Sequence, residues 1–145
     1  MRNLAAPIYT GTLNGKPLRF FRPPFAEPHI PWHVPHDLHI CLGMPLELRQ
    51  HYQRMLQSAD WAPDVRTVAT CDGIVTIGPH WMAQGLITSV IHFGRATTAV
   101  EFAYSEAVAE ALKVSAGDLT PNAFVSFTTR AFANTHGCQA TRGLV

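Results

Sequence analysis

Arginine and glutamine recur along residues 45–58, a segment whose spacing predicts a helix opened by Pro45. The apolar positions of this segment repeat at helical intervals and are expected to face the core: Leu48, Tyr52, Met55 and Leu56. The opposite face is expected to carry Arg49, Gln50, Gln53, Arg54 and Gln57. Arginine binds guanine edges and phosphates, and glutamine binds adenine edges. The pattern therefore predicts contact with nucleic acid through this face, the alternative being a solvated or protein-facing surface.

Histidines are concentrated just before this segment, at intervals of 4, 3 and 3 residues: His29, His33, His36 and His39. Zinc needs three or four such donors that converge on one point. Pro31 and Pro35 interrupt any helix through the set, so only His36 and His39 are expected to share a helix face. The set is a candidate metal site, and surface histidines on a proline-rich loop are the alternative.

Cysteine spacing gives no sign of a disulfide framework or of a redox motif. Cys41, Cys71 and Cys138 are odd in number and widely spaced, so reduced, buried thiols of a cytosolic protein are expected. The chain has no Gly-x-Ser-x-Gly, no Gly-rich phosphate loop and no His-Glu-x-x-His sequence. We therefore predict no catalytic residue and no cofactor, and an enzyme is the less favoured class.

Turn-forming pairs mark two hairpins that must position these residues. Asn14-Gly15 predicts a hairpin over residues 8–21, and Asp72-Gly73 predicts a second over residues 65–77, because both pairs tolerate positive φ. Between them, five prolines predict an extended loop over residues 22–35, with a short strand near Trp32.

Helices are expected in the remaining segments. One helix is expected over residues 35–43, where Pro35 can open it and Gly43 can close it. Together with the helix at 45–58, it resembles a helix-turn-helix in outline. Further helices are expected from Pro79 to about Phe93, from Thr98 with a Glu101 capping box to Lys113, and from Thr120-Pro121 to about Asn134, with frayed residues after 136. A strand over 97–105 is an alternative. Blocks of strands and helices predict an α+β fold, a small antiparallel sheet from two hairpins packed with four to five helices.

Residues 31–43 read PWHVPHDLHICLG and resemble the PWF-x-A-x-D-V-x-x-x-L-G signature of the Bro-N domain of phage antirepressors and baculovirus repeated proteins. A hairpin precedes this segment, and an arginine-bearing helix and a second hairpin follow, so the resemblance covers about residues 8–90. It implies a DNA-binding, regulatory role in phages or mobile elements. It also implies structural roles for Trp32, Asp37, Leu38, Leu42 and Gly43, and DNA contacts by Arg49, Gln50, Gln53 and Arg54.

Length and composition limit the remaining possibilities. The 145 residues fit a single domain, with the Bro-N-like region at about 8–90 and a helical extension over 95–136. Net charge is only +1, so charge alone does not indicate nucleic-acid binding. Only 14% of residues are charged, against about 25% in typical domains, which favours a surface partly covered by a partner. Neither a signal peptide nor a stretch of about 20 apolar residues is present, so we expect a soluble, cytoplasmic protein without membrane contact.

Three functions are consistent with these observations. The first is a DNA-associated regulator that binds duplex DNA through residues 45–58, with a homodimer as the expected form, because two copies double the contact. The second is a small inhibitor or adaptor that binds another protein, for example one of a host defence complex. The third is a metal-dependent enzyme that uses the histidines of residues 29–39.

The last helix is expected to face the core with a stripe formed by Phe124, Phe127 and Ala131. Phe132 lies off this stripe and is a candidate dimer contact.

Overall fold

Strands and helices follow one another in blocks along the chain. The computed structural model describes residues 3–142, with side chains described to residue 137. Its elements are β1 (Tyr9–Leu13), β2 (Lys16–Phe21), β3 (Trp32–His33), α1 (Pro35–Cys41), α2 (Leu46–Leu56), the short 3-10 helix η1 (Ala62–Asp64), β4 (Arg66–Thr70), β5 (Gly73–Ile77), α3 (His80–His92), α4 (Thr98–Ala116) and α5 (Pro121–Arg142). This order confirms the predicted α+β class, including a helix rather than a strand at residues 98–105.

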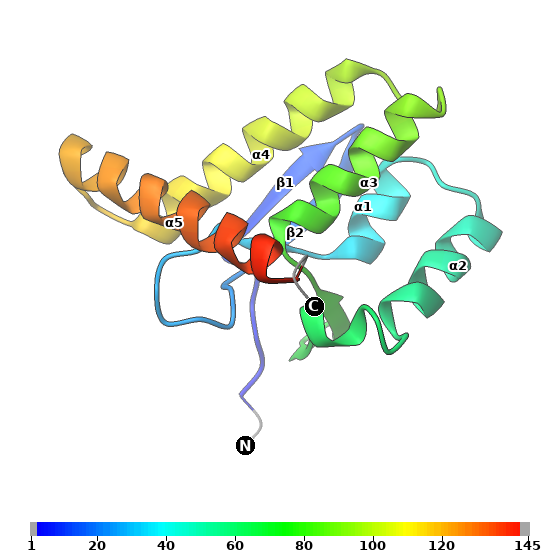
Figure 1. Cartoon of the computed structure of the whole chain (residues 1–145), viewed down its shortest axis with the longest axis horizontal. Coiled ribbons are helices and arrows are strands. Elements are labelled where there is room, and N and C mark those ends of the chain that lie inside the picture. Colours follow the sequence, from blue (N-terminus) through cyan, green and yellow to red (C-terminus); the bar gives the residue numbers. More distant parts are fainter. Residues whose placement is uncertain (1–2, 143–145) are drawn as a thin grey trace.

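The first sheet is built on a tight hairpin. Asn14 and Gly15 have φ values of 53° and 76°, which a two-residue turn matching strand twist requires, so β1 pairs with β2 as the sequence predicted. The short strand predicted near Trp32 is β3, whose two residues pair with Phe20 and Phe21 at the end of β2. α4 covers β1 so closely that a Cβ at Gly11 would lie 3.1 Å from that of Ala107 (Figure 1).

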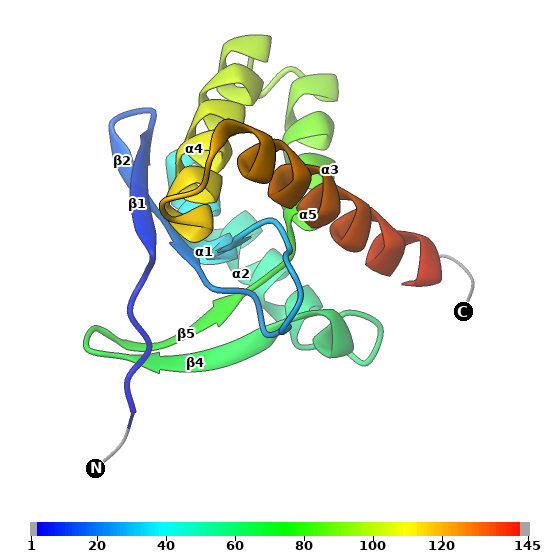
Figure 2. The same cartoon turned by 90° about the vertical axis from the view of Figure 1, so that its left-hand side faces the viewer.

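The second hairpin is a separate sheet of β4 and β5, rather than part of the first. The two sheets are linked by one bridge, in which His33 and Gly78 exchange backbone hydrogen bonds of 2.9 and 3.1 Å. The N-terminal segment also reaches β4, because the Ala5 amide donates to the Ala69 carbonyl at 2.8 Å. The hairpin of β4 and β5 extends away from α3, α4 and α5 (Figure 2).

α1 and α2 are joined by a short turn at Gly43, whose φ of 67° suits glycine. α1 is anchored to β2 by Asp37, which accepts from the Arg19 side chain at 2.8 and 3.0 Å and from the Arg19 amide at 3.1 Å. Leu38 is fully buried beside it and Trp32 is 4% exposed. Asp37 and Leu38 therefore hold α1 on the first sheet.

Two details of the last helices differ from the sequence-based expectation. α4 begins after Thr97 without a side-chain cap, so Thr98 is its first residue and does not form the predicted capping box. α5 continues to Arg142 instead of ending near Asn134. Its distal part is anchored because Asn134 donates to the Pro28 carbonyl at 2.7 Å and the buried Thr135 hydroxyl accepts from the Ile30 amide at 3.1 Å. The Thr120 cap is confirmed by its bond from the Ala123 amide.

The core lies where β1, β2 and α1 meet α3, α4 and α5. Its fully buried side chains include Leu13, Leu18, Phe20, Ile30, Leu38, Ala111 and Ala131. Phe132 is partly buried and packs against this cluster, with its ring 6.3 Å from that of His80. Across residues 3–142, no helix combines the length and apolar character needed to cross a membrane.

Candidate functional site

The five residues of the segment 45–58 that were predicted to face outward fall into two groups. Gln50, Arg54 and Gln57 are exposed, as expected. Arg49 and Gln53 are partly buried, because they lie at the edge of the face that α2 packs inward. The Gln53 amide nitrogen lies 3.3 Å from Nδ1 of His36 on α1. The expectation of one continuous outward face is therefore wrong for Arg49 and Gln53.

Arg49 stands out further, since its Nε is buried and has no hydrogen-bond partner among the described residues. Its guanidinium is close enough to His39 to disfavour a second positive charge there. Buried polar atoms are nearly always paired in native proteins. Arg49 therefore lies partly on the inner side of α2 and is not a fully exposed contact residue.

A second element adds polar groups beside the exposed face of α2. A depression of about 350 Å³ separates α2 from the β4–β5 hairpin, and its lining includes Gln53, Gln57, Arg66, Thr67 and Thr76. Arg66 is exposed while its Nη1 donates to the Pro63 and Val65 carbonyls at 3.1 and 2.9 Å. Arg19, by contrast, is held by Asp37 and does not line this depression. The polar surface is thus shared by α2 and the hairpin.

The four candidate metal-binding histidines do not converge on a common point. His29, His33 and His39 are buried and only His36 is exposed, so the surface-loop interpretation is wrong for three of them. His29 stacks on Phe25 at 4.2 Å, and His39 packs on Tyr52 at 5.4 Å. Among the described residues, no group of three or more histidine, cysteine or acidic side chains is arranged to hold a metal ion.

Burial keeps the interior imidazoles uncharged. It lowers the pKa of His33 to about 3, helped by the neighbouring His80 and His39. Burial likewise lowers the pKa of His39 to about 4 and that of His80 to about 4. His80 Nδ1 lies 3.0 Å from the hydroxyl of Tyr104, whose pKa burial raises. These groups are therefore neutral at ordinary pH and act as polar core residues.

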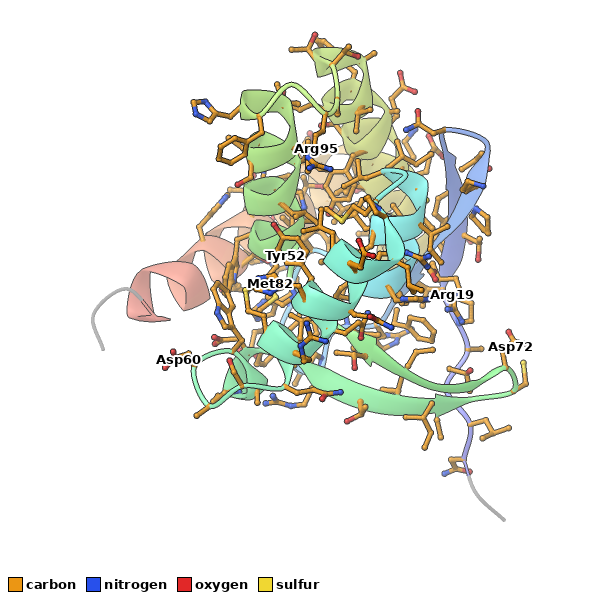
Figure 3. All side chains as sticks on the ribbon, turned by 90° about the vertical axis from the view of Figure 1, so that its right-hand side faces the viewer. Arg19, Tyr52, Asp60, Asp72, Met82 and Arg95 are labelled. Atoms are coloured by element: carbon orange, nitrogen blue, oxygen red, sulfur yellow. The ribbon has the colours of Figure 1, made fainter. Side chains whose placement is uncertain are left out.

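A cavity of about 380 Å³ lies on the inner side of α2, between this helix and α3. Figure 3 shows Tyr52 of α2 and Met82 of α3 near one another where these helices face each other, and both line the cavity. Aromatic walls are added by Trp61 and Trp81, whose ring centroids are 6.2 Å apart. His33 and His39 also line it. This cavity could not be predicted from the sequence, because its residues come from separate segments that only packing brings together.

The thiols differ from one another in their surroundings. Cys41 is buried, its Sγ lies 3.5 Å from the Pro17 carbonyl, and burial raises its pKa to about 11. Cys71 is exposed at the tip of the second hairpin, so the expectation of a buried thiol is wrong there. The Cys138 side chain lies outside the described residues. Cys41 and Cys71 are both free thiols that form no disulfide.

Comparison with known proteins identifies no relative. The chain matches no protein-family model, and no curated protein or solved structure is significantly similar to it. The class that fold and surface define is thus an α+β domain in which a helix pair is followed by a β-hairpin, with polar groups between the second helix and the hairpin.

Proposed function

We propose that this protein is a DNA-associated regulator of the phage or mobile-element type, which contacts duplex DNA through the exposed side of α2. The observation that carries the proposal is the polar surface between α2 and the β4–β5 hairpin, where the exposed Gln57 and Arg66 line one depression. Arg54 is also exposed, three residues before Gln57 on the outer side of α2. Such a regulator would act in the cytoplasm of its host cell. The resemblance of residues 31–43 to the Bro-N signature supports the same role.

The shape of this region supports insertion into a groove. α2 has 11 residues and is therefore about 16 Å long, and α1 supports it through a glycine turn. Helix pairs of this kind place their second helix in the major groove, while flanking elements contact the backbone. In this arrangement Gln50 and Arg54 would reach base edges or phosphates, and Arg66 of the hairpin would reach a neighbouring phosphate.

The charge of the surface predicts modest affinity. Arg54 and Arg66 are the exposed cations of this surface, and Arg49 is half-buried behind them. With two or three phosphate contacts, the logarithm of affinity would fall with the logarithm of salt concentration with a slope of about −2 to −3 per copy. A homodimer would double both contact and slope, which is how small helix-pair domains commonly reach useful affinity.

Fluorescence anisotropy with labelled duplex DNA of random sequence at low salt tests the proposal. R54A and R66A should each weaken binding and each reduce the salt slope by about 1. R130A is the matched control, because Arg130 is an exposed arginine of α5, outside the α2–hairpin surface. Arg49 is a poorer probe, since its burial would mix a stability effect with a binding effect.

Two outcomes would contradict the proposal. The first is the absence of binding to any duplex at low salt. The second is an equal effect of R130A and R54A, which would indicate general electrostatic attraction rather than a defined surface. Thermal unfolding of each variant ensures that a loss of binding is not a loss of folding.

A protein-interaction role is the second candidate, and exposed aromatic side chains favour it. Phe93 and Phe102 are 75% and 72% exposed, near the end of α3 and the start of α4. Large exposed apolar groups are frequent at protein contacts, including those of homodimers. Sedimentation analysis of the wild type against F93S and F102S tests this role. A monomer that forms no complex with itself or with a host protein would exclude it.

A further inference from the structure

The inner side of α2 bounds a site that is independent of the surface proposed for DNA. The exposed face of this helix carries Gln50, Arg54 and Gln57, whereas Tyr52, Met55 and Leu56 line the cavity of about 380 Å³. This volume lies within the range of roughly 300–1,000 Å³ that small-molecule sites occupy. The cavity is also the larger and more apolar of the two hollows that flank α2.

The walls of the cavity suit a flat apolar ring. Tyr52, Trp61 and Trp81 supply aromatic faces and edges, and aromatic pairs gain from stacked or edge-to-face contact. Met55 and Met82 add flexible, polarisable sulfurs that adapt to the outline of a bound ring. An aromatic molecule could therefore bury its faces against these walls, with the side at Gly85 and Ser89 left open.

Two buried histidines are among the polar side chains that line the cavity. His33 and His39 are 1% and 3% exposed, and Nδ1 of each has no hydrogen-bond partner within the described part of the chain. A neutral imidazole donates from one ring nitrogen and accepts at the other. An unpaired buried nitrogen costs about 1–3 kcal/mol, so a ligand group that reached either Nδ1 through a small shift of its ring would gain from relieving that cost.

The lining also indicates the charge of the ligand. Among the described side chains that line the cavity, none is a carboxylate, a lysine or an arginine. Burying an ionised group there would cost its hydration, and the walls themselves hold no opposite charge to replace it; Arg49, near His39, lies outside the lining. We propose that the cavity behind α2 is a binding site for a small, uncharged aromatic molecule that carries a hydrogen-bonding group, such as a heteroaromatic ring with an N–H.

Gly85 provides a way to close the site without disturbing its walls. It lines the cavity from the exposed side of α3, and a Cβ built on it meets no atom within 4 Å. Leucine is also a better helix former than glycine, so G85L should fold. Ser89 is one turn further along at the same opening, and S89L is a second closing variant. T88L is the matched control, because Thr88 is exposed on α3 and does not line the cavity.

The test is a titration of the ¹⁵N-labelled full chain with indole, followed by NMR at the side-chain N–H signals of Trp61 and Trp81. We expect saturable shifts of both signals in the wild type and in T88L. G85L and S89L should weaken indole binding by about tenfold or more, because they fill the opening. 1-Methylindole, which keeps the ring but lacks the N–H, should bind about tenfold more weakly than indole.

Three results would overturn the proposal. The first is the absence of saturable shifts up to the solubility limit of indole. The second is binding that survives unchanged in both G85L and S89L, which would place the ligand elsewhere. The third is tighter binding of indole-3-carboxylate than of indole, which would show that the site selects an anion. Because no DNA is present, none of these results depends on the DNA proposal.

Discussion

Acid should unfold this protein over a pH range set by its buried histidines. Burial lowers the pKa of His33 to about 3 and those of His39 and His80 to about 4, whereas in an unfolded chain each would titrate near 6.5. Burial also lowers the pKa of His29. The unfolded state therefore binds more protons than the folded state below about pH 6.5, and acid favours unfolding.

The size of the effect follows from these values. At pH 5 an unfolded histidine is about 1.5 pH units below its pKa and holds its proton, while the folded groups remain neutral. Each unit is worth about 1.4 kcal/mol, so each of the three histidines costs about 2 kcal/mol and together they cost about 6 kcal/mol. Domains of this kind have about 5–15 kcal/mol of stability in total. The stabilisation is fully present above pH 6.5 and is lost as pH falls towards 4.

Urea unfolding followed by tryptophan fluorescence at pH 7.5, 6.5, 5.5 and 5 measures this loss. The slope below pH 6 should approach about 4 kcal/mol per pH unit, which corresponds to three protons taken up on unfolding. H80Q should reduce that slope by about a third, even though loss of the Tyr104 contact also lowers its stability at pH 7.5. H92Q should leave the slope unchanged, because His92 is exposed. A free energy of unfolding that stays constant between pH 7.5 and 5 would refute the reasoning.

Three further outcomes follow from single contacts. D37A should cost about 3 kcal/mol in urea unfolding, because it leaves the half-buried Arg19 side chain without its carboxylate; an effect below that of a typical surface pair would contradict this. G43A should cost about 1 kcal/mol, since its φ of 67° disfavours a Cβ, and an unchanged midpoint would contradict it. In a C138S background, iodoacetamide should modify Cys71 rapidly and Cys41 about 100-fold more slowly by mass spectrometry, and equal rates would contradict the burial of Cys41.

Local sequence signals determined the elements of this fold. Asn14-Gly15 produced its hairpin because the pair accepts the positive φ that the turn needs, whatever surrounds it. Thr120 caps α5 for an equally local reason, since its hydroxyl reaches an amide three residues ahead. The inward stripe of α2 was also predictable, because helical periodicity depends only on the chain itself.

Tertiary packing alone determined which residues of the candidate sites are buried and where the cavity forms. Periodicity indicates the direction of the buried face of α2 but not its width, and contacts beyond the helix draw Arg49 and Gln53 partly inside. In the same way, no spacing rule predicts that His33 and His39 are buried, because polar residues enter a core only when non-local neighbours enclose them. The cavity behind α2 depends entirely on such neighbours, since it exists only where α2, the segment around Trp61 and α3 fail to fill the space between them.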